Sequence, residues 1–416
     1  MFLEKKKNFK NQINVRKKKL KKFLPKKRKR IKKFSVCSLL LLIIIMFIIS
    51  LIIVFYKKII GIIFRQETFD DIPISYQYEL SINQINLSNL EELKKINLNK
   101  IPLYKEDKIK KNFILFRKKQ NKNKIHICMS SDLNLIYPTL VSMTSALENN
   151  NENINILVYH LFLPSNITDE DINIFESLKS KYRVRIYYYK IPPIFEQYRA
   201  WGGSTTVYWK LLIPFILPNL KRYIFLDGDT LVFEDLSDMY NLNFNDTYVF
   251  GFFFHTASSL RKFRINVNNY INSGVILINN EKIIKDGKDI ELLKFTLENS
   301  KKMSYPTQDP LNAVFNPNIG ILPLKYGLYL IGNINVFNKF KKYIKYHVNE
   351  TELIEAINKP AIIHLCCCNP KIWHKESRHD FGDNSTCIRY HNDFYYYANK
   401  TDYYKDMYNI YIKENL

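Results

Sequence analysis

The sequence has no Cys-x-x-Cys pair among its six cysteines, so a cysteine-rich zinc site is poorly supported. Cys37 and Cys128 lie in apolar stretches, and the remaining cysteines are the triplet 366–368 and Cys387. A disulfide from the triplet to Cys387 and burial as small apolar side chains are both compatible with this pattern. The sequence also has no detectable internal repeat, which favours one large domain over a repeat array.

Acidic residues are nearly absent from residues 1–33, where Glu4 is the only one among dense lysines and arginines. Most of the formal net charge of +24 therefore lies in this segment. Residues 34–56 carry no charge and reach the ~20 apolar residues that cross a bilayer. The run is longer than that of a cleaved signal peptide and lacks a small-residue cleavage site. We predict a basic cytoplasmic tail at 1–33 and a transmembrane anchor at 34–56, in a single-pass type II topology.

The basic tail has a second interpretation, as a nuclear or nucleic-acid-binding segment. The adjoining apolar run makes membrane orientation the simpler explanation, and we expect no nucleic-acid partner. Residues 57–122 are rich in Lys, Asn and Glu without a sustained apolar face, which predicts a stem. A type II anchor places the rest of the chain in the lumen of the Golgi or endoplasmic reticulum. Asn-x-Ser/Thr sequons agree with this placement, at Asn86, Asn166, Asn245, Asn349, Asn384 and Asn399.

Short apolar strands alternate with helical stretches from residue 123 onward. The predicted strands are 125–129, 154–161, 183–189, 223–226, 248–254, 274–278 and 361–364. The predicted helices are 136–147, 168–180 and 207–213; Thr168 opens the second, and Pro214 and Pro218 interrupt and stop the third. This alternation indicates βαβ units and a parallel α/β sheet in one domain, residues 123–416.

Two carboxylates, in Asp227-Gly228-Asp229, directly follow the predicted strand 223–226. Ligands of α/β sheets bind at the carboxyl ends of the strands, and a turn at the glycine can bring both carboxylates to one cation. Oxygen ligands of this kind suit Mg²⁺ or Mn²⁺. Asp-Gly-Asp is also a common turn sequence, so the rest of the chain decides its meaning.

Four further motifs follow the order found in one enzyme family. They are Tyr208-Trp209-Lys210, Asn272-Ser273-Gly274, Gln308-Asp309, and His364 with Lys371-Ile372-Trp373. With Asp227-Gly228-Asp229 they resemble the glycogenin-like, family 8 retaining glycosyltransferases, over residues 124–373. The resemblance implies a GT-A fold, a Rossmann-like nucleotide-sugar-binding domain with a mixed, mostly parallel sheet. It also implies transfer of a hexose or pentose from a UDP-sugar to a glycan or protein acceptor, with Mn²⁺ as cofactor.

The resemblance assigns the metal to Asp227, Asp229 and His364. Gly228 belongs to the same turn, and Lys371 and Asn272 are placed beside the diphosphate and the donor sugar. Asp132 and Asn134, after the first strand, are placed at the uracil edge. Three of these residues also have plain structural interpretations: a helix cap for Asp132, a structural histidine for His364 and an ordinary turn for Asn272.

The resemblance gives the catalytic positions to Gln308, Asp309 and Lys210. Gln308 is a poor nucleophile, so we favour internal return, in which the leaving phosphate guides the acceptor and Asp309 orients the sugar or Lys210. Taken alone, Lys210 reads as a solvated lysine, and 304–309 as the cap of the next helix.

The sequence departs from the family pattern at Cys367, where glycine is usual, and at Ile372, where proline is usual. The His364-to-Lys371 spacing is one residue longer, and 251–255 holds no carboxylate. These departures support an alternative, an inactive relative that only binds a nucleotide sugar. The aromatic-rich segment after His374 is expected either to stack on sugars or to pack as a terminal helix.

Overall fold

The computed structural model describes residues 123–411 except for 197, 199, 201–202, 254–259, 261–262, 264, 266–268, 328–349, 367, 369–370 and 375–384. The predicted tail, anchor and stem, and Cys367, therefore lie outside the described residues. The chain divides into two compact units, 1–67 and 68–416, and every described residue belongs to the second. Among the described helices, none is long and apolar enough to cross a membrane.

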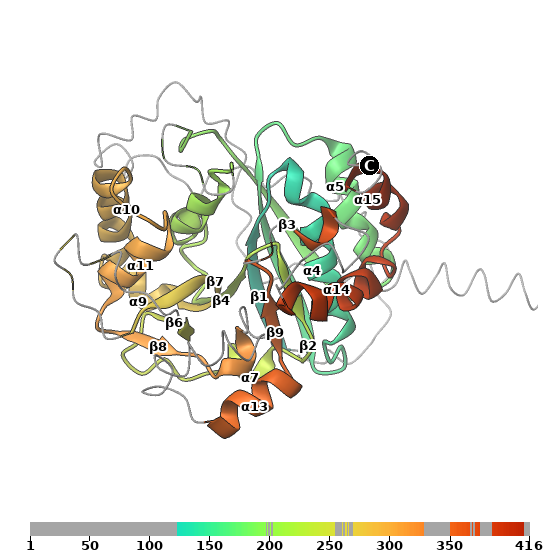
Figure 1. The fold of residues 1–416 in the computed structure, drawn as a ribbon. Coiled ribbons are helices and arrows are strands. Elements are labelled where there is room, and N and C mark those ends of the chain that lie inside the picture. Colours follow the sequence, from blue (N-terminus) through green and yellow to red (C-terminus); the bar gives the residue numbers. More distant parts are fainter. Residues whose placement is uncertain are drawn as a thin grey trace, which may run out of the picture. The chain divides into compact units, whose positions relative to one another are not determined.

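A seven-stranded mixed sheet forms the centre of the described domain (Figure 1), in the order β3-β2-β1-β4-β7-β6-β8. Its strands are β1 Asn123–Ser130, β2 Asn155–Pro164, β3 Val184–Ile191, β4 Arg222–Leu226, β6 Val249–Phe253, β7 Ile271–Asn279 and β8 Ile319–Ile321. Strands β1 to β4 are parallel, β7 runs antiparallel to β4 and β6, and β8 is parallel to β6. The predicted mixed, mostly parallel sheet is confirmed. Strand β7 starts three residues earlier than predicted, at Ile271.

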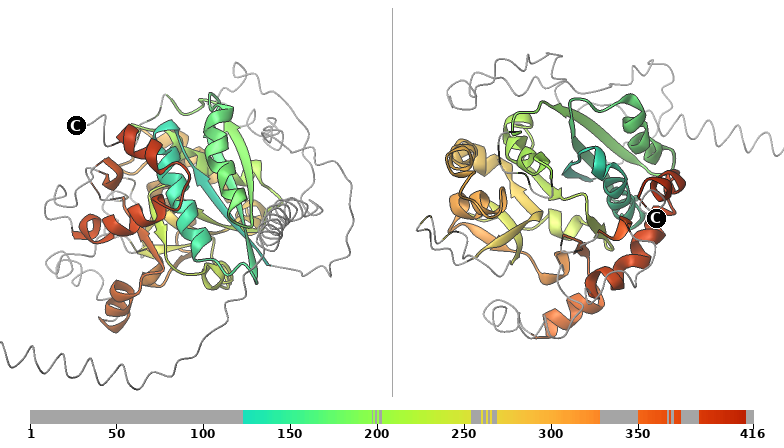
Figure 2. Two further views of the ribbon diagram at one scale, coloured as in Figure 1. Left: turned by 90° about the vertical axis from the view of Figure 1, so that its right-hand side faces the viewer. Right: turned by 45° about the horizontal axis from the view of Figure 1, so that its top comes forward.

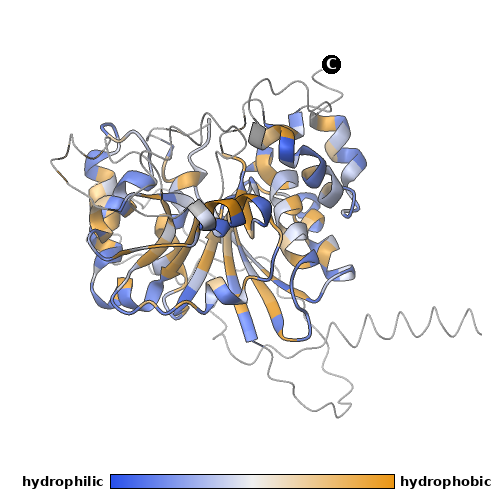
Figure 3. Cartoon of the chain, turned by 60° about the horizontal axis from the view of Figure 1, so that its bottom comes forward, coloured by the Kyte–Doolittle hydropathy of each residue, from blue (hydrophilic) through white to orange (hydrophobic). Residues whose placement is uncertain are grey.

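Helices cover both faces of this sheet because its strands carry apolar side chains on both sides. Alternate residues such as Ile127 and Leu161 pack in one core with α4 (Ile136–Glu148) and α5 (Asp169–Glu176). The intervening residues, such as Phe225 and Ile276, pack in a second core with η5, α6, α10 and α11. Figure 2 shows the two helix layers, and Figure 3 shows apolar strands beneath helices whose outer sides are hydrophilic.

The remaining described helices have these bounds: η3 Leu133–Leu135, η4 Ser177–Ser180, η5 Thr206–Leu212, α6 Ile213–Ile216, α7 Ser237–Tyr240, α9 Asn280–Lys285, α10 Lys288–Asn299, α11 Gln308–Phe315, η6 Leu324–Tyr326, α13 Glu350–Asn358, η7 Ile372–His374, α14 Ser385–Ala398 and α15 Tyr404–Tyr411. Thr168 caps α5 through a capping box with Asp171, as the sequence predicts. The predicted helix 207–213 needs a correction. It is a 3₁₀ helix, and Pro214 opens the following α6 because the first turn needs no N–H from it.

A second, two-stranded sheet pairs β5 (Thr230–Val232) with β9 (Ile362–His364) in antiparallel fashion. A third apolar cluster joins these strands to α13 and α14. A Cys368–Cys387 disulfide links the segment after β9 to α14, so the disulfide alternative holds for Cys368. The α14 side chains Tyr390, Phe394 and Tyr397 are buried, which confirms helix packing for this part of the aromatic-rich segment.

Candidate active site

The first carboxylate of the site continues a strand. Asp227 follows β4, and its backbone N–H donates to the Gly274 carbonyl oxygen of β7 over 2.8 Å, which extends the β4–β7 ladder by one residue. The Thr230 hydroxyl closes the turn by donating to the Asp227 carbonyl oxygen over 3.0 Å. This leaves the Asp227 side chain about a third exposed, at 32%.

Strand register brings a histidine to the second carboxylate. Thr230 of β5 is paired with His364 of β9, and Leu365 N–H donates to the Asp229 carbonyl oxygen over 2.8 Å. The His364 Nε2 atom therefore lies 3.1 Å from Asp229 Oδ1 and 3.6 Å from Asp227 Oδ2. Residues 135 apart in sequence thus converge on the turn that begins at Asp227.

The three side chains fit a divalent metal ion. One ligand atom from each of Asp227, Asp229 and His364 lies within 4.8 Å of the other two. Two ligands of one ion at ~2.1 Å can be at most about 4.2 Å apart, and the Asp227 side chain, which is about a third exposed, has room to adjust to this distance. Two carboxylates and one imidazole are donors suited to Mn²⁺ or Mg²⁺. The described geometry is therefore compatible with the predicted ligand set.

Two glycines allow this close packing. A Cβ at Gly274 would overlap the His364 ring and lie 2.5 Å from Asp227 Oδ2. A Cβ at Gly228 would overlap the Thr139 hydroxyl of α4. Both positions thus require glycine because a side chain would not fit there. An unusual backbone angle is not the reason.

Lys371 neutralises the second carboxylate. Its Nζ atom donates to Asp229 Oδ2 over 2.7 Å and to the Leu365 carbonyl oxygen over 3.2 Å. Burial alone would raise the pKa of Asp229, but Lys371 and His364 outweigh it and hold that pKa well below its usual range. Burial alone would lower the pKa of His364, and the Asp229 carboxylate outweighs it, so the His364 pKa is raised.

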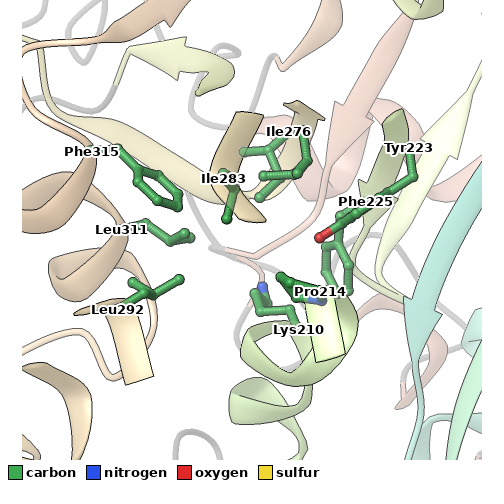
Figure 4. Close-up of a pocket in the computed structure, with 10 residues that line it drawn as sticks. Lys210, Pro214, Tyr223, Phe225, Ile276, Ile283, Leu292, Leu311 and Phe315 are labelled. Atoms are coloured by element: carbon green, nitrogen blue, oxygen red, sulfur yellow. The ribbon is translucent and has the colours of Figure 1, made fainter. Parts of the chain in front are cut away.

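Lys210 lies on the other side of the cluster, at the end of η5. Its side chain is only 4% exposed, so the solvated-lysine interpretation is wrong. The Nζ atom lies 3.1 Å from Asp227 Oδ1 and donates to the Ser273 carbonyl oxygen over 2.9 Å. Its stem borders a small apolar cavity lined by residues such as Pro214 and Ile276 (Figure 4). This surrounding directs the ammonium group towards the carboxylate.

The Asn272 motif connects this region to the start of α11. The Asn272 side-chain oxygen accepts from the Gly274 N–H over 2.7 Å. The neighbouring Ser273 hydroxyl lies 3.5 Å from the Thr307 hydroxyl, directly before α11. Gln308, the first residue of α11, is buried, and its Nε2 atom has no hydrogen-bond partner among the described residues. A buried amide donor without a partner suits a ligand oxygen.

Asp309 has a structural set of contacts. One carboxylate oxygen accepts from the Tyr270 hydroxyl over 2.6 Å, and the other from the N–H groups of Ser304 and Tyr305 over 2.8 and 3.1 Å. These bonds hold the turn that precedes Gln308. The interpretation of 304–309 as a helix cap is not confirmed, because the N-cap residue Thr307 makes no side-chain cap hydrogen bond. A role for Asp309 in orienting the sugar or Lys210 stays a prediction.

Asp132 and Asn134 lie beyond the carboxyl end of β1. The Asp132 side chain accepts from the N–H groups of Asn134 and Leu135 over 3.0 and 3.1 Å, which is the helix-cap interpretation. Asn134 is exposed. Their place at the carboxyl edge agrees with a ligand site there. The role at a uracil ring stays a prediction.

Sequence reasoning missed two contributors to the site. The Thr139 hydroxyl against Gly228 and the Leu365 carbonyl that holds Lys371 give no local signal, because a single threonine or leucine is compatible with any core. The role of Gly274 could have been predicted from the sequence, because the glycine is part of the Asn-x-Gly motif. Of the departures, Ile372 is fully buried in the cluster with α14, so the exchange for proline is accommodated by packing.

The fold and the site define a GT-A-type α/β protein with a cluster of side chains that could hold a metal ion. Residues 126–377 match glycosyl transferase family 8, more than half of the chain, and the protein belongs to this family. It is a glycosyltransferase. The resemblance seen in the sequence is confirmed.

Named relatives agree with this family. The lipopolysaccharide 1,2-glucosyltransferase of Escherichia coli is 28% identical over 236 residues, which are 53% of this chain and 68% of the relative. The galactosyltransferase LgtC, solved with donor and acceptor sugar analogues, has a TM-score of 0.51 at 17% identity, covering 67% of this chain and 96% of LgtC. The apo form of the bifunctional glycosyltransferase WbbM has a TM-score of 0.55 at 18% identity, covering 71% of this chain and 52% of WbbM.

Proposed function

We propose that this protein is a retaining glycosyltransferase that transfers a hexose or pentose, of the glucose, galactose or xylose class, from a UDP-sugar to a glycan or glycoprotein acceptor. The observation that carries the proposal is the cluster of Asp227, Asp229 and His364 with a lysine on either side. The activities of the similar Escherichia coli glucosyltransferase and of the structural neighbour LgtC, a galactosyltransferase, support the hexose class.

Asp227, Asp229 and His364 would hold the cation, with Mn²⁺ preferred and Mg²⁺ possible. When bound, this ion neutralises the charge that builds on a diphosphate leaving group. Lys210 and Lys371 each donate to one of the two carboxylates in the described state. Both ammonium groups are therefore positioned within reach of a diphosphate that binds to the cation held by these carboxylates.

Retention is proposed because of the side chains that the family resemblance places near the sugar. Gln308 offers a neutral amide, and its unpartnered Nε2 can donate to a sugar or phosphate oxygen but cannot form a stable glycosyl ester. Asp309 is held by Tyr270, Ser304 and Tyr305 at the base of the turn. Internal return, with the acceptor entering on the face of the departing phosphate, is the path that these side chains favour.

The placement of the enzyme is part of the proposal. Residues 34–56 would anchor it as a type II protein, with the domain in the Golgi or endoplasmic reticulum lumen. The Cys368–Cys387 disulfide supports this placement, because disulfides form and persist in oxidising compartments.

The test replaces one ligand at a time in the full-length chain. Asp227→Asn and Asp229→Asn keep the side-chain shape and remove the charge that binds the cation, so UDP release from a panel of UDP-sugars with Mn²⁺ should fall at least about a hundredfold. Asp246→Asn is the matched control, because this exposed carboxylate pairs, within the described part of the chain, with Lys282 and Asn318 and with no residue of the metal cluster. Full turnover in either site variant, or after chelation of the metal, would disprove the metal assignment.

The binding-only alternative predicts a different result from the same panel. Such a protein would bind UDP in the presence of Mn²⁺, with loss of binding in both site variants, but would release no UDP from any donor with any acceptor.

A further inference from the structure

Helix α14 contacts the segment that carries Lys371 at two points. The first is the Cys368–Cys387 disulfide, which joins the segment to the first turns of α14. At the second, the Trp373 and Phe394 rings lie 5.9 Å apart, and the Tyr395 hydroxyl donates to the Ile372 carbonyl oxygen over 3.4 Å. Lys371 lies between these two anchors.

The segment is also folded back on itself at the site. The Leu365 carbonyl oxygen accepts from the Cys368 N–H over 3.1 Å and from Lys371 Nζ over 3.2 Å. The disulfide therefore holds one end of the turn from which the lysine reaches Asp229. Any displacement of Cys368 would move the carbonyl group and the lysine together.

Helix α14 is itself fixed to the rest of the domain. The Asn149 side chain at the end of α4 donates to the Tyr397 hydroxyl over 2.8 Å. Phe233, after β5, contacts the rings of Tyr390 and Tyr397, with ring centroids 5.9 and 6.0 Å apart. A rigid support of this kind can transmit position to the segment that it holds.

We propose that α14 is a positioning element of the active site, and that Cys368, Cys387 and Phe394 act through Lys371 to hold its ammonium group at the metal end. The inference rests on the proposed function, because Lys371 is taken to meet the donor diphosphate. It assigns a role in donor binding to residues that touch neither metal nor donor. The disulfide therefore sets the geometry of the binding site and also stabilises it.

The experiment measures coupling to Lys371 in the full-length chain. The paired variant Cys368→Ser/Cys387→Ser is made with Lys371 present and with Lys371→Met, and the affinity for UDP with Mn²⁺ and the KM for the donor are measured. With Lys371 present we expect affinity to fall about tenfold, since small misplacements of a positioned group weaken its action strongly. In the Lys371→Met background the same exchange should change affinity less than about twofold.

Two further variants separate positioning from general loss of stability. Phe394→Leu loosens the second anchor with the disulfide closed, and its effect should likewise require Lys371. Tyr397→Phe is the matched control: it loses the bond to Asn149 but keeps the ring that contacts Phe233, so α14 stays fixed and the effect on affinity should be equal in both backgrounds. Phe394→Leu also keeps the test decisive if the paired serine variant does not fold.

The inference is overturned if disulfide removal and Phe394→Leu lower UDP affinity equally with and without Lys371, or not at all. Hydrogen exchange of the 365–374 backbone gives a readout that does not depend on the donor. The exchange rate should rise in the serine variant and stay unchanged in Tyr397→Phe. If the wild-type chain binds no UDP with Mn²⁺, the proposed function fails instead, and the exchange measurement still reports on the two anchors.

Discussion

Gly274→Ala is the smallest change expected to disable the site. The added methyl group would overlap the His364 ring and lie 2.5 Å from Asp227 Oδ2, so both side chains cannot keep their positions. His364 cannot retreat easily, because it is only 2% exposed and belongs to β9. Asp227 can move, since its side chain is 32% exposed, but it then leaves Lys210.

The magnitude follows from overpacking and from lost ligation. Inserting a methyl group into a filled core destabilises a protein by about 1–3 kcal/mol, and the close contact places this site towards the upper end. In a domain of this size such a loss lowers the Tm by roughly 2–4 °C per kcal/mol. Displacing one ligand should weaken Mn²⁺ binding at least about tenfold and reduce UDP release further.

The assay compares Mn²⁺ binding, thermal melting and UDP release in Gly274→Ala and in a control, Gly320→Ala. A Cβ at Gly320 would overlap the Phe250 ring at the β6–β8 edge of the sheet, away from the carboxylates. The control should therefore lose stability and keep metal affinity. Wild-type Mn²⁺ affinity and turnover in Gly274→Ala would refute the packing argument and the ligand set on which it depends.

Three further predictions follow from other contacts. Burial lowers the pKa of His126 from 6.5 to about 4 and that of His160 well below 6.5; the unfolded chain therefore takes up protons first, and stability should fall as the pH drops below about 6.5, by at most roughly 1.4 kcal/mol per histidine near pH 5.5. Urea melts between pH 7 and 5 measure this loss, and an equal slope in His126→Gln would contradict it. UDP should raise the affinity for Mn²⁺ in titration calorimetry, and equal Mn²⁺ affinity with and without UDP would show that the sites are independent. Glycosidase treatment of the cell-expressed chain should increase its electrophoretic mobility, and an unchanged mobility would count against the lumenal placement.

The sequence was sufficient for six of the seven strands of the central sheet, all but β8, and for the ends of the strands that carry the site. Apolar runs such as 223–226 end in polar residues, and this pattern fixes both a buried strand and the edge where its carboxylates lie. Register between distant strands leaves no such local signal. The pairing of Thr230 with His364 depends on the whole domain, so the sequence alone could place His364 at the site only through the family resemblance.

For the charged side chains too, the local sequence predicts less than the contacts in the folded domain show. As a residue type Lys210 reads as an exposed lysine, because lysine is rarely buried unless it is paired. Its burial follows from the apolar residues before and after it in η5 and α6, together with a carboxylate that happens to lie opposite. For Asp309 the sequence predicted a catalytic role. Its contacts show instead that its carboxylate holds a turn by accepting from three donors.

The described state has two carboxylates balanced by two lysines. A divalent cation alone must displace Lys371 from Asp229, so the lysine opposes its binding. A diphosphate changes this balance, because its negative charge attracts the ammonium group that the cation displaces. Binding of the cation and binding of the diphosphate then favour each other, so each ligand should raise the affinity for the other. This reciprocal coupling follows from the charges alone. The same reasoning explains why Lys371 has to be held from α14 as well as by Asp229: once the carboxylate turns to the metal, the disulfide, the Trp373 contact and the bond to the Leu365 carbonyl oxygen keep the lysine at the site.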